Sequence, residues 1–174
     1  YAGLQGTKFS VVRYGNVLAS RGSVVPLFLQ QRDSGVLSVT DPQMTRFWIT
    51  LDEAVAFVLN ALTWMVGSEI YVPKIPSMKV VDLAETLAPE CRVEFIGKRP
   101  GEKVHEVLIT EEESEYTLEF EDHYAIRPPN PPWELKGHLD EGRPVEAGFR
   151  YSSNENSLWM TREELTEHLN LLAS

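Results

Sequence analysis

Apolar and polar positions alternate in blocks along this chain, and the blocks predict a succession of strands and helices. Short apolar runs rich in β-branched residues predict strands, and longer stretches with apolar residues at helical spacing predict helices. Because the two kinds of element mostly alternate, the predicted fold class is α/β. The expected strands are Phe9–Arg13, Val36–Val39, Arg46–Ile49, Ile70–Val72 and Val93–Ile96.

Three helices are expected in the first hundred residues. Val24–Arg32 follows Ser23, and Met78–Leu87 follows Ser77, so each helix has a candidate capping serine. The clearest helix begins at Thr50, which is spaced to form a capping box with Glu53. The apolar side chains of this helix recur at helical spacing and are expected to pack into the core: Leu51, Val55, Val58, Leu59 and Leu62.

The last third of the chain has a different composition. After Thr110 it carries the acidic run EEESEYTLEFEDH, which is typical of a solvated face. The segment RPPNPP can be neither a helix nor a central strand. The final segment TREELTEHLNLL predicts an amphipathic helix with a second capping box, Thr161 to Glu164. We therefore interpret residues 111–174 as a hairpin-and-helix extension packed on the domain formed by residues 1–110.

The overall composition excludes several classes of protein. The 174 residues carry a net charge of −10, which argues against general nucleic-acid binding because such binding needs a basic face. A single cysteine, Cys91, excludes an intramolecular disulfide and fits a reducing compartment. No histidine or cysteine pair has metal-site spacing, so no metal is expected. The absence of a run of about 18 apolar residues predicts no membrane span, and the first residues read like the middle of a longer chain.

Basic residues gather in loops that follow the predicted strands. An acidic protein that binds a phosphorylated ligand must bring its few cations together. Arg46 lies at the mouth of a strand, Arg99 lies in the turn GKRPGEK, and Arg21 lies in the loop after the first strand. A lone arginine is more often a surface ion pair, worth under about 1 kcal/mol. Three such loops together favour an anion site, since ligands of open α/β sheets sit beyond the carboxyl ends of the strands.

Four stretches carry a family resemblance: RYGNVLASRGSVVPLF, TDPQMTRFWIT, IYVPKIPSMKVVDLAE and IGKRPGEKVHEVLI. Together they resemble the C-terminal half of the UDP-N-acetylglucosamine 4,6-dehydratase (inverting) family of extended short-chain dehydrogenase/reductases. The tail is similar to the short form that starts pseudaminic acid biosynthesis, a pathway linked to flagellin glycosylation. The resemblance implies the substrate-binding part of a Rossmann-like fold, a nucleotide-sugar substrate, NADP or NAD, a cytoplasmic location and a homo-oligomer at full length.

The resemblance also implies roles for individual residues. The Tyr14–Val17 segment, which contains Gly15, is expected beside the nicotinamide, and Asn16 is expected to reach the sugar diphosphate. Glu102 suits the ribose hydroxyls, because a carboxylate accepts from both at once. The remaining expected contacts are Val24, Val25, Pro26 and Thr40 around the uridine, and Arg46 and Arg99 on the diphosphate.

The hydride-transfer machinery of that family is absent from this sequence. No Gly-rich dinucleotide loop follows a strand, and Tyr1 lacks the lysine four residues on that a Tyr-x-x-x-Lys motif requires. We therefore expect no catalytic residue here, a cofactor held mostly by another half, and no turnover by this chain alone. Two alternatives remain open: a non-catalytic nucleotide-sugar-binding or scaffold module, and a retaining or membrane-anchored 4,6-dehydratase of polysaccharide biosynthesis.

Overall fold

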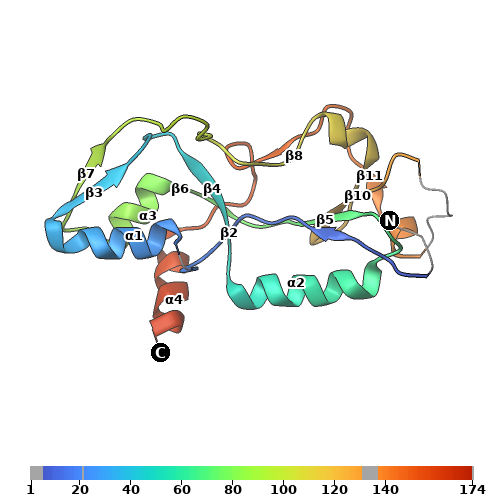
Figure 1. Cartoon of the computed structure of the whole chain (residues 1–174), viewed down its shortest axis with the longest axis horizontal. Coiled ribbons are helices and arrows are strands. Elements are labelled where there is room, and N and C mark those ends of the chain that lie inside the picture. Colours follow the sequence, from blue (N-terminus) through green and yellow to red (C-terminus); the bar gives the residue numbers. More distant parts are fainter. Residues whose placement is uncertain (1–5, 21, 131–136, 174) are drawn as a thin grey trace. The chain divides into compact units, whose positions relative to one another are not determined.

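The computed structural model describes residues 6–20, 22–130 and 137–173 (Figure 1), and the chain divides into two compact units. Unit 1 comprises residues 1–14, 52–74 and 107–151, and unit 2 comprises residues 15–51, 75–106 and 152–174. Each unit therefore combines segments that are distant in the sequence. The division into 1–110 and an extension stays a prediction. Arg21, one of the predicted cations, lies outside the described residues.

Unit 1 is built on a five-stranded mixed sheet with the strand order β1-β5-β10-β9-β11. β1 is parallel to β5, and the remaining pairs are antiparallel. The buried side chains Phe57, Ala61 and Tyr71 contribute to its core. The strands are β1 (Val11–Val12), β5 (Ile70–Pro73), β9 (Thr117–Glu119), β10 (His123–Ile126) and β11 (Arg143–Pro144), with α2 (Leu51–Trp64), β8 (Val107–Ile109), η2 (Glu112–Tyr116) and η3 (His138–Glu141) completing the unit.

The described residues of unit 2 form two small sheets and three α-helices. One sheet has the order β2-β4-β6, and the other pairs β3 with β7 in parallel. Helix α3 packs against both α1 and α4, and α1 also contacts β3 (Figure 1). The elements are β2 (Asn16–Val17), α1 (Val24–Gln31), η1 (Arg32–Ser34), β3 (Val36–Val39), β4 (Thr45–Ile49), β6 (Ser77–Lys79), α3 (Val80–Leu87), β7 (Arg92–Phe95) and α4 (Arg162–Ala173), while β12 (Tyr151–Ser152) spans the boundary between the units.

The predicted α/β class is confirmed, but the start of one helix and the cap of another were predicted wrongly. The segment Ser77–Lys79 is a strand, because it pairs antiparallel with β4, and its helix begins only at Val80. Ser23 precedes α1 as expected, yet its side chain makes no capping hydrogen bond. The first strand is also shorter than expected and covers only Val11–Val12.

The orientation of α2 differs from the prediction. Its buried residues are Ala54, Phe57 and Ala61. Because the packed face uses these residues, the apolar positions chosen from the sequence point outward instead. Their exposed fractions are 59% for Leu51, 49% for Val55, 37% for Val58, 57% for Leu59 and 61% for Leu62.

The C-terminal helix begins as predicted. The backbone N–H of Thr161 donates to the Glu164 carboxylate at 2.7 Å, and the Glu164 N–H donates back to the Thr161 hydroxyl at 3.2 Å. This reciprocal pair is the capping box. Just upstream, Asn156 donates to the carbonyl of Ile75 at 2.8 Å, which ties the tail to unit 2. Among the described helices, none is long and apolar enough to cross a membrane.

Candidate functional site

A cavity of about 420 Å³ lies in unit 2, where the loop after β2, helix α1, the end of β3 and the turn after β7 face one another. Its walls are partly apolar, with Leu27, Phe28 and Ile96 among the lining residues. Six of the residues predicted from the sequence line this cavity: Asn16, Val24, Thr40, Arg46, Arg99 and Glu102.

The remaining predicted residues lie elsewhere, and their roles stay predictions. Val25 is 1% exposed and packs in the core of unit 2. Pro26 lies in α1 and Val17 in β2, and neither lines the cavity. Tyr14 belongs to unit 1, and Gly15 begins the next segment of unit 2.

Gly15 is required by the close approach of two backbone segments. A Cβ atom at this position would lie 2.5 Å from the Cβ of Phe47 and 2.6 Å from its carbonyl oxygen. The next residues, Asn16 and Val17, pair in parallel with Trp48 and Ile49 of β4. Only glycine therefore lets β2 start beside β4 and carry the Asn16 side chain to the cavity.

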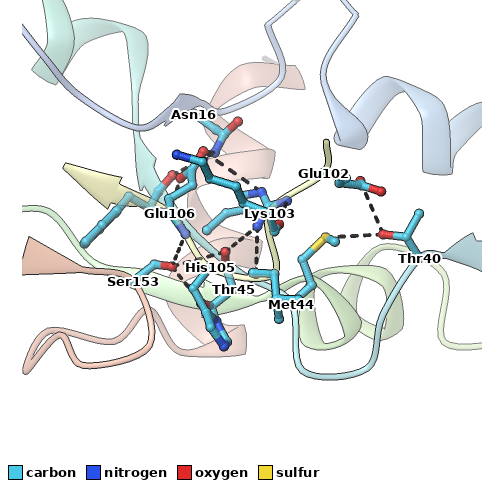
Figure 2. A network of polar contacts seen from close by, with 12 residues as sticks. Asn16, Thr40, Met44, Thr45, Glu102, Lys103, His105, Glu106 and Ser153 are labelled. Atoms are coloured by element: carbon cyan, nitrogen blue, oxygen red, sulfur yellow. Dashed lines mark hydrogen bonds and ion pairs between the residues drawn. The ribbon is translucent and has the colours of Figure 1, made fainter. Parts of the chain in front are cut away.

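Asn16 is held by the acidic residue Glu106, as Figure 2 shows. The Asn16 side-chain nitrogen lies 3.1 Å from each Glu106 carboxylate oxygen and 3.3 Å from the Phe47 carbonyl oxygen. Glu106 also accepts from the backbone N–H of Phe47 at 3.0 Å. Glu106 had not been predicted as a site residue, because its contacts are with residues 59 and 90 positions away.

A second polar cluster lies next to Glu106. The Thr45 hydroxyl lies 2.8 Å from His105 Nδ1 and 2.7 Å from the Ser153 hydroxyl (Figure 2). The Ser153 hydroxyl in turn accepts from the backbone N–H of Glu106 at 2.9 Å. These contacts join β4, the 105–106 segment and the C-terminal segment. His105 is therefore part of a hydrogen-bond network that stabilises unit 2.

Arg46 holds the turn before Glu106 through the turn's carbonyl groups. Its guanidinium donates to the carbonyls of Thr45 at 2.7 Å, Val104 at 3.0 Å and Lys103 at 2.9 Å. Its Nε lies 4.0 Å from the Glu106 carboxylate. Arg46 also lines the cavity. Most of its guanidinium N–H groups already donate to these carbonyl groups, so few are free for a ligand, but its positive charge can still attract an anion.

Arg99 and Glu102 lie in the exposed turn after β7. The Arg99 backbone N–H donates to the Glu102 carboxylate at 3.1 Å, and the Thr40 hydroxyl donates to the same carboxylate at 3.3 Å. Within the described parts of the chain, the Arg99 guanidinium makes no hydrogen bond or ion pair. Among the described residues that line this cavity, Arg99 is therefore the basic residue whose guanidinium N–H groups are all free to bind a ligand.

Two buried polar atoms of the cavity wall were not predicted from the sequence. The indole N–H of Trp48 and the hydroxyl of Ser23 are buried, and neither has a hydrogen-bond partner among the described residues. Leaving a buried polar group unpaired costs about 1–3 kcal/mol. Trp48 lies two positions after Arg46 on β4, and side chains at this spacing lie on the same face of a strand. This spacing was the local signal in the sequence that both side chains could line one cavity.

A second and larger cavity, of about 610 Å³, lies in unit 1. One wall contains a histidine pair whose Nε2 atoms, from His123 and His138, are 3.1 Å apart. His123 Nδ1 lies 2.6 Å from the Asp122 carboxylate, and the Trp64 and Phe120 rings stack on the His123 ring at centroid distances of 4.3 and 4.4 Å. Four carboxylates and one arginine line this cavity, so it would repel a diphosphate and is not the candidate site.

The buried histidine predicts a pH dependence of stability. Burial lowers the pKa of His123 below its ordinary value of about 6.5, and the Asp122 carboxylate only partly offsets this. The unfolded chain therefore binds a proton more readily, so the free energy of unfolding is expected to decrease as the pH falls through 6.5 toward the lower folded pKa. Thermal unfolding of the parent between pH 7.5 and 5.5 measures this.

The His123→Gln variant is the control for this pH dependence. Glutamine can still donate to Asp122 and accept from His138, but it does not titrate. Its melting temperature should change less with pH than that of the parent. An equal dependence in the His123→Gln variant would contradict the assignment.

Comparison with known proteins identifies the family. The family described as "Polysaccharide biosynthesis protein" matches residues 1–128. The chain belongs to this polysaccharide biosynthesis protein family. The predicted resemblance to the inverting UDP-N-acetylglucosamine 4,6-dehydratases is confirmed, and it concerns the C-terminal half of such proteins.

Two curated relatives of this chain carry the names of enzymes that act on UDP-sugars. A "UDP-N-acetylglucosamine 4,6-dehydratase (inverting)" from Campylobacter jejuni is 46% identical over 97% of this chain and 53% of its own length. A "UDP-glucose 4-epimerase" from Rickettsia conorii is 36% identical over 94% of this chain and 49% of its own length. The chain thus spans about half the length of these curated relatives.

A solved structure supports the predicted fold. The structure described as "X-ray structure of Pen from Bacillus thuringiensis" matches this family member with a TM-score of 0.81 and 34% identity. The match covers 97% of this chain and 52% of that one. The predicted fold class, the C-terminal part of a Rossmann-like extended short-chain dehydrogenase/reductase fold, is therefore confirmed.

Proposed function

We propose that this chain is the nucleotide-sugar-binding half of an inverting UDP-N-acetylglucosamine 4,6-dehydratase. The observation that carries the proposal is the 420 Å³ cavity of unit 2, which gathers residues from four separate segments. It combines apolar walls, which suit a base, with the free donors of Arg99, which suit a diphosphate, and the acceptors of Glu102, which suit hydroxyl groups.

The proposed reaction removes water from C5 and C6 of the sugar after oxidation at C4, with inversion at C5. NADP or NAD, bound mostly by a second half of the protein, supplies hydride acceptance and return. The part of this chain expected to contact the cofactor is the Tyr14–Val17 segment, which ends in the short edge strand β2. That small wall fits a cofactor whose main contacts come from elsewhere, and we expect no turnover by the 174-residue chain alone.

The finer parts of the proposal follow from the family resemblance. They are a place at the first step of pseudaminic acid-type biosynthesis, a cytoplasmic location and a homo-oligomer in the full-length form. The similarity of 46% over 97% of the chain to the Campylobacter dehydratase supports this version of the function over an epimerase.

Arg99→Ala is expected to weaken UDP binding by about ten- to a hundredfold, because a charge-assisted hydrogen bond contributes about 1.5–3 kcal/mol. Arg46→Ala is expected to weaken binding to a similar extent, in part by releasing the turn at Lys103 and Val104. Arg99→Lys should not restore affinity, since an ammonium cannot make the bidentate contact. Calorimetric titration of the chain with UDP measures these effects.

The matched control is Arg92→Ala, because Arg92 is exposed on β7 and does not line the cavity. It should leave UDP affinity within about twofold of the parent, well below the tenfold that 1.4 kcal/mol represents. If the parent chain does not bind UDP, or if Arg99→Ala binds it as tightly as the parent, the proposed diphosphate site is wrong.

A further inference from the structure

The histidine pair of unit 1, His123 and His138, shares one hydrogen bond, and a neighbouring carboxylate fixes the direction of that bond. His123 Nδ1 lies 2.6 Å from the Asp122 carboxylate, so this nitrogen carries a hydrogen and donates it. In a neutral histidine the other ring nitrogen, Nε2, is then an acceptor. The contact of 3.1 Å between the two Nε2 atoms therefore requires His138 to donate from its Nε2.

Two aromatic rings enclose this hydrogen bond. The rings of Trp64 and Phe120 each lie within 5° of the plane of His123, with centroids 4.3 and 4.4 Å away. Both rings also stack on His138, at 4.9 and 4.4 Å. Two rings this close have no room side by side on one face of an imidazole, so they cover opposite faces. A bridging hydrogen fits between the Nε2 atoms, whereas a metal ion there would lack space for its further ligands.

His123 is held more firmly than His138. His123 is 1% exposed, and its carbonyl accepts from the Phe120 N–H at 2.9 Å in the β9–β10 hairpin. The His138 side chain is 17% exposed, and it begins η3 directly after Gly137. The next residue, Leu139, is 5% exposed and packs in the core of unit 1. If the two rings separate, His138 is therefore the one that moves, while Leu139 keeps η3 on the sheet.

The charges around the pair come from each element packed against it, and burial outweighs their attraction for a proton. Burial lowers the pKa of His123, and the charges of His138 and Lys74 lower it further. The Asp122 carboxylate only partly offsets this, and Tyr71 stays neutral because burial raises its pKa. His123 therefore takes up a proton only as the pH falls below the ordinary histidine value of about 6.5. The other charged residues that line the cavity beside the pair are Glu119, Glu121, Glu141 and Arg143.

We propose that the His123–His138 hydrogen bond is a pH-sensitive latch, which is closed while His123 is neutral and opens when His123 takes up a proton from solvent at Nε2. Both ring nitrogens of His123 then carry hydrogens, so two donors face each other where one donor and one acceptor had met. Their repulsion moves His138 out from between Trp64 and Phe120, and these two rings become exposed to the cavity of unit 1. The latch lies entirely within unit 1, so the inference does not depend on the proposed nucleotide-sugar site.

Side-chain NMR of the parent chain with ¹⁵N-labelled histidine tests the latch without any variant. At pH 7.5 one Nε2 hydrogen should couple to nitrogens of both rings, and the His138 ring hydrogens should be shifted upfield by the Trp64 and Phe120 ring currents. Both signals should be lost as the pH falls below 6.5, while the backbone resonances of β10 persist. The ratio of open to closed latch should increase by up to about tenfold per pH unit, as uptake of a single proton requires.

Two variants of His138 fix the latch in its two states. In His138→Gln the side-chain amide can present either a donor or an acceptor to His123, so the contact should persist whether or not His123 is protonated. The Trp64 ring resonances of this variant should stay those of the closed parent over the same pH range. In His138→Ala they should match the open form at every pH. Thermal unfolding at each pH shows whether each variant remains folded.

Each outcome decides the inference. Loss of the shared hydrogen in the parent on acidification, with pH-independent Trp64 resonances in His138→Gln, supports the latch. Three results would overturn it: no coupling between the two rings at pH 7.5, His138 ring hydrogens that stay upfield until the whole chain unfolds, or a parent-like pH dependence in His138→Gln. Zn²⁺ is the last probe, because displacement of the shared hydrogen by Zn²⁺ would show that the pair binds a metal and would equally overturn the latch.

Discussion

Gly15→Ala is expected to destabilise unit 2 by about 3 kcal/mol, the upper part of the range for overpacking a close contact. The added Cβ would lie 2.5 Å from the Phe47 Cβ and 2.6 Å from the Phe47 carbonyl oxygen. Neither neighbour can move easily, because the backbone on each side is paired: Leu18 N–H donates to the Ile49 carbonyl at 2.9 Å, just after the β2–β4 ladder. Urea unfolding followed by circular dichroism measures the loss.

Gly35→Ala is the matched control, because it adds the same methyl group in the same unit. A Cβ there meets no atom within 4 Å, and the cost is limited to the positive φ of 72°. For an L-residue that conformation costs about 1–2 kcal/mol. If Gly15→Ala is no more destabilising than Gly35→Ala, the close approach of β2 and β4 is not as tight as described.

The second large effect concerns the outward face of α2, defined by Leu51, Val55, Val58, Leu59 and Leu62. We expect the chain produced by itself to self-associate at micromolar concentration, because contiguous exposed apolar side chains of this kind drive association. The double variant Leu59→Lys/Leu62→Lys should shift the mass measured by light scattering to that of a monomer. Its helix content should be unchanged, since lysine is a good helix former.

The opposite face of α2 provides the contrast. Phe57 is 7% exposed and packs in the core of unit 1, so Phe57→Ala should cost about 3–5 kcal/mol of stability. That variant should unfold more easily and aggregate more, whereas the two lysine substitutions should leave the melting temperature nearly unchanged. A parent chain that is already a monodisperse monomer would show that this outward face does not drive association.

Several elements were predictable because local patterns alone favour them. The strand Val36–Val39 has the bounds expected from its β-branched residues, and α2 ends close to its last apolar position. The capping box of Thr161 and Glu164 forms as its spacing requires. In contrast, Ser77–Lys79 is a strand only because β4 lies beside it, and no local pattern reports a partner thirty residues away.

Part of the site could be predicted from the sequence. Arg46 and Arg99 were expected at an anion site from their places beside predicted strands, and the family resemblance added Asn16, Val24, Thr40 and Glu102. The cavity of unit 2 is lined by all six. Glu106 was missed, since its importance depends on contacts to Asn16 and Phe47 that the sequence does not display. The buried indole of Trp48 was missed for the same reason.

By itself, the sequence determined the α/β class, most helices and strands, the acidic character and the family to which the chain belongs, because these depend on local periodicity, composition and contiguous motifs. The tertiary structure alone decided which face of α2 is buried, that Gly15 must pass against Phe47, and that the Asn16 amide nitrogen lies against the Glu106 carboxylate. Each of these depends on a contact between segments far apart in the chain. A side chain's hydrogen-bonding direction is set by the neighbours that reach it in space, and sequence spacing does not encode that.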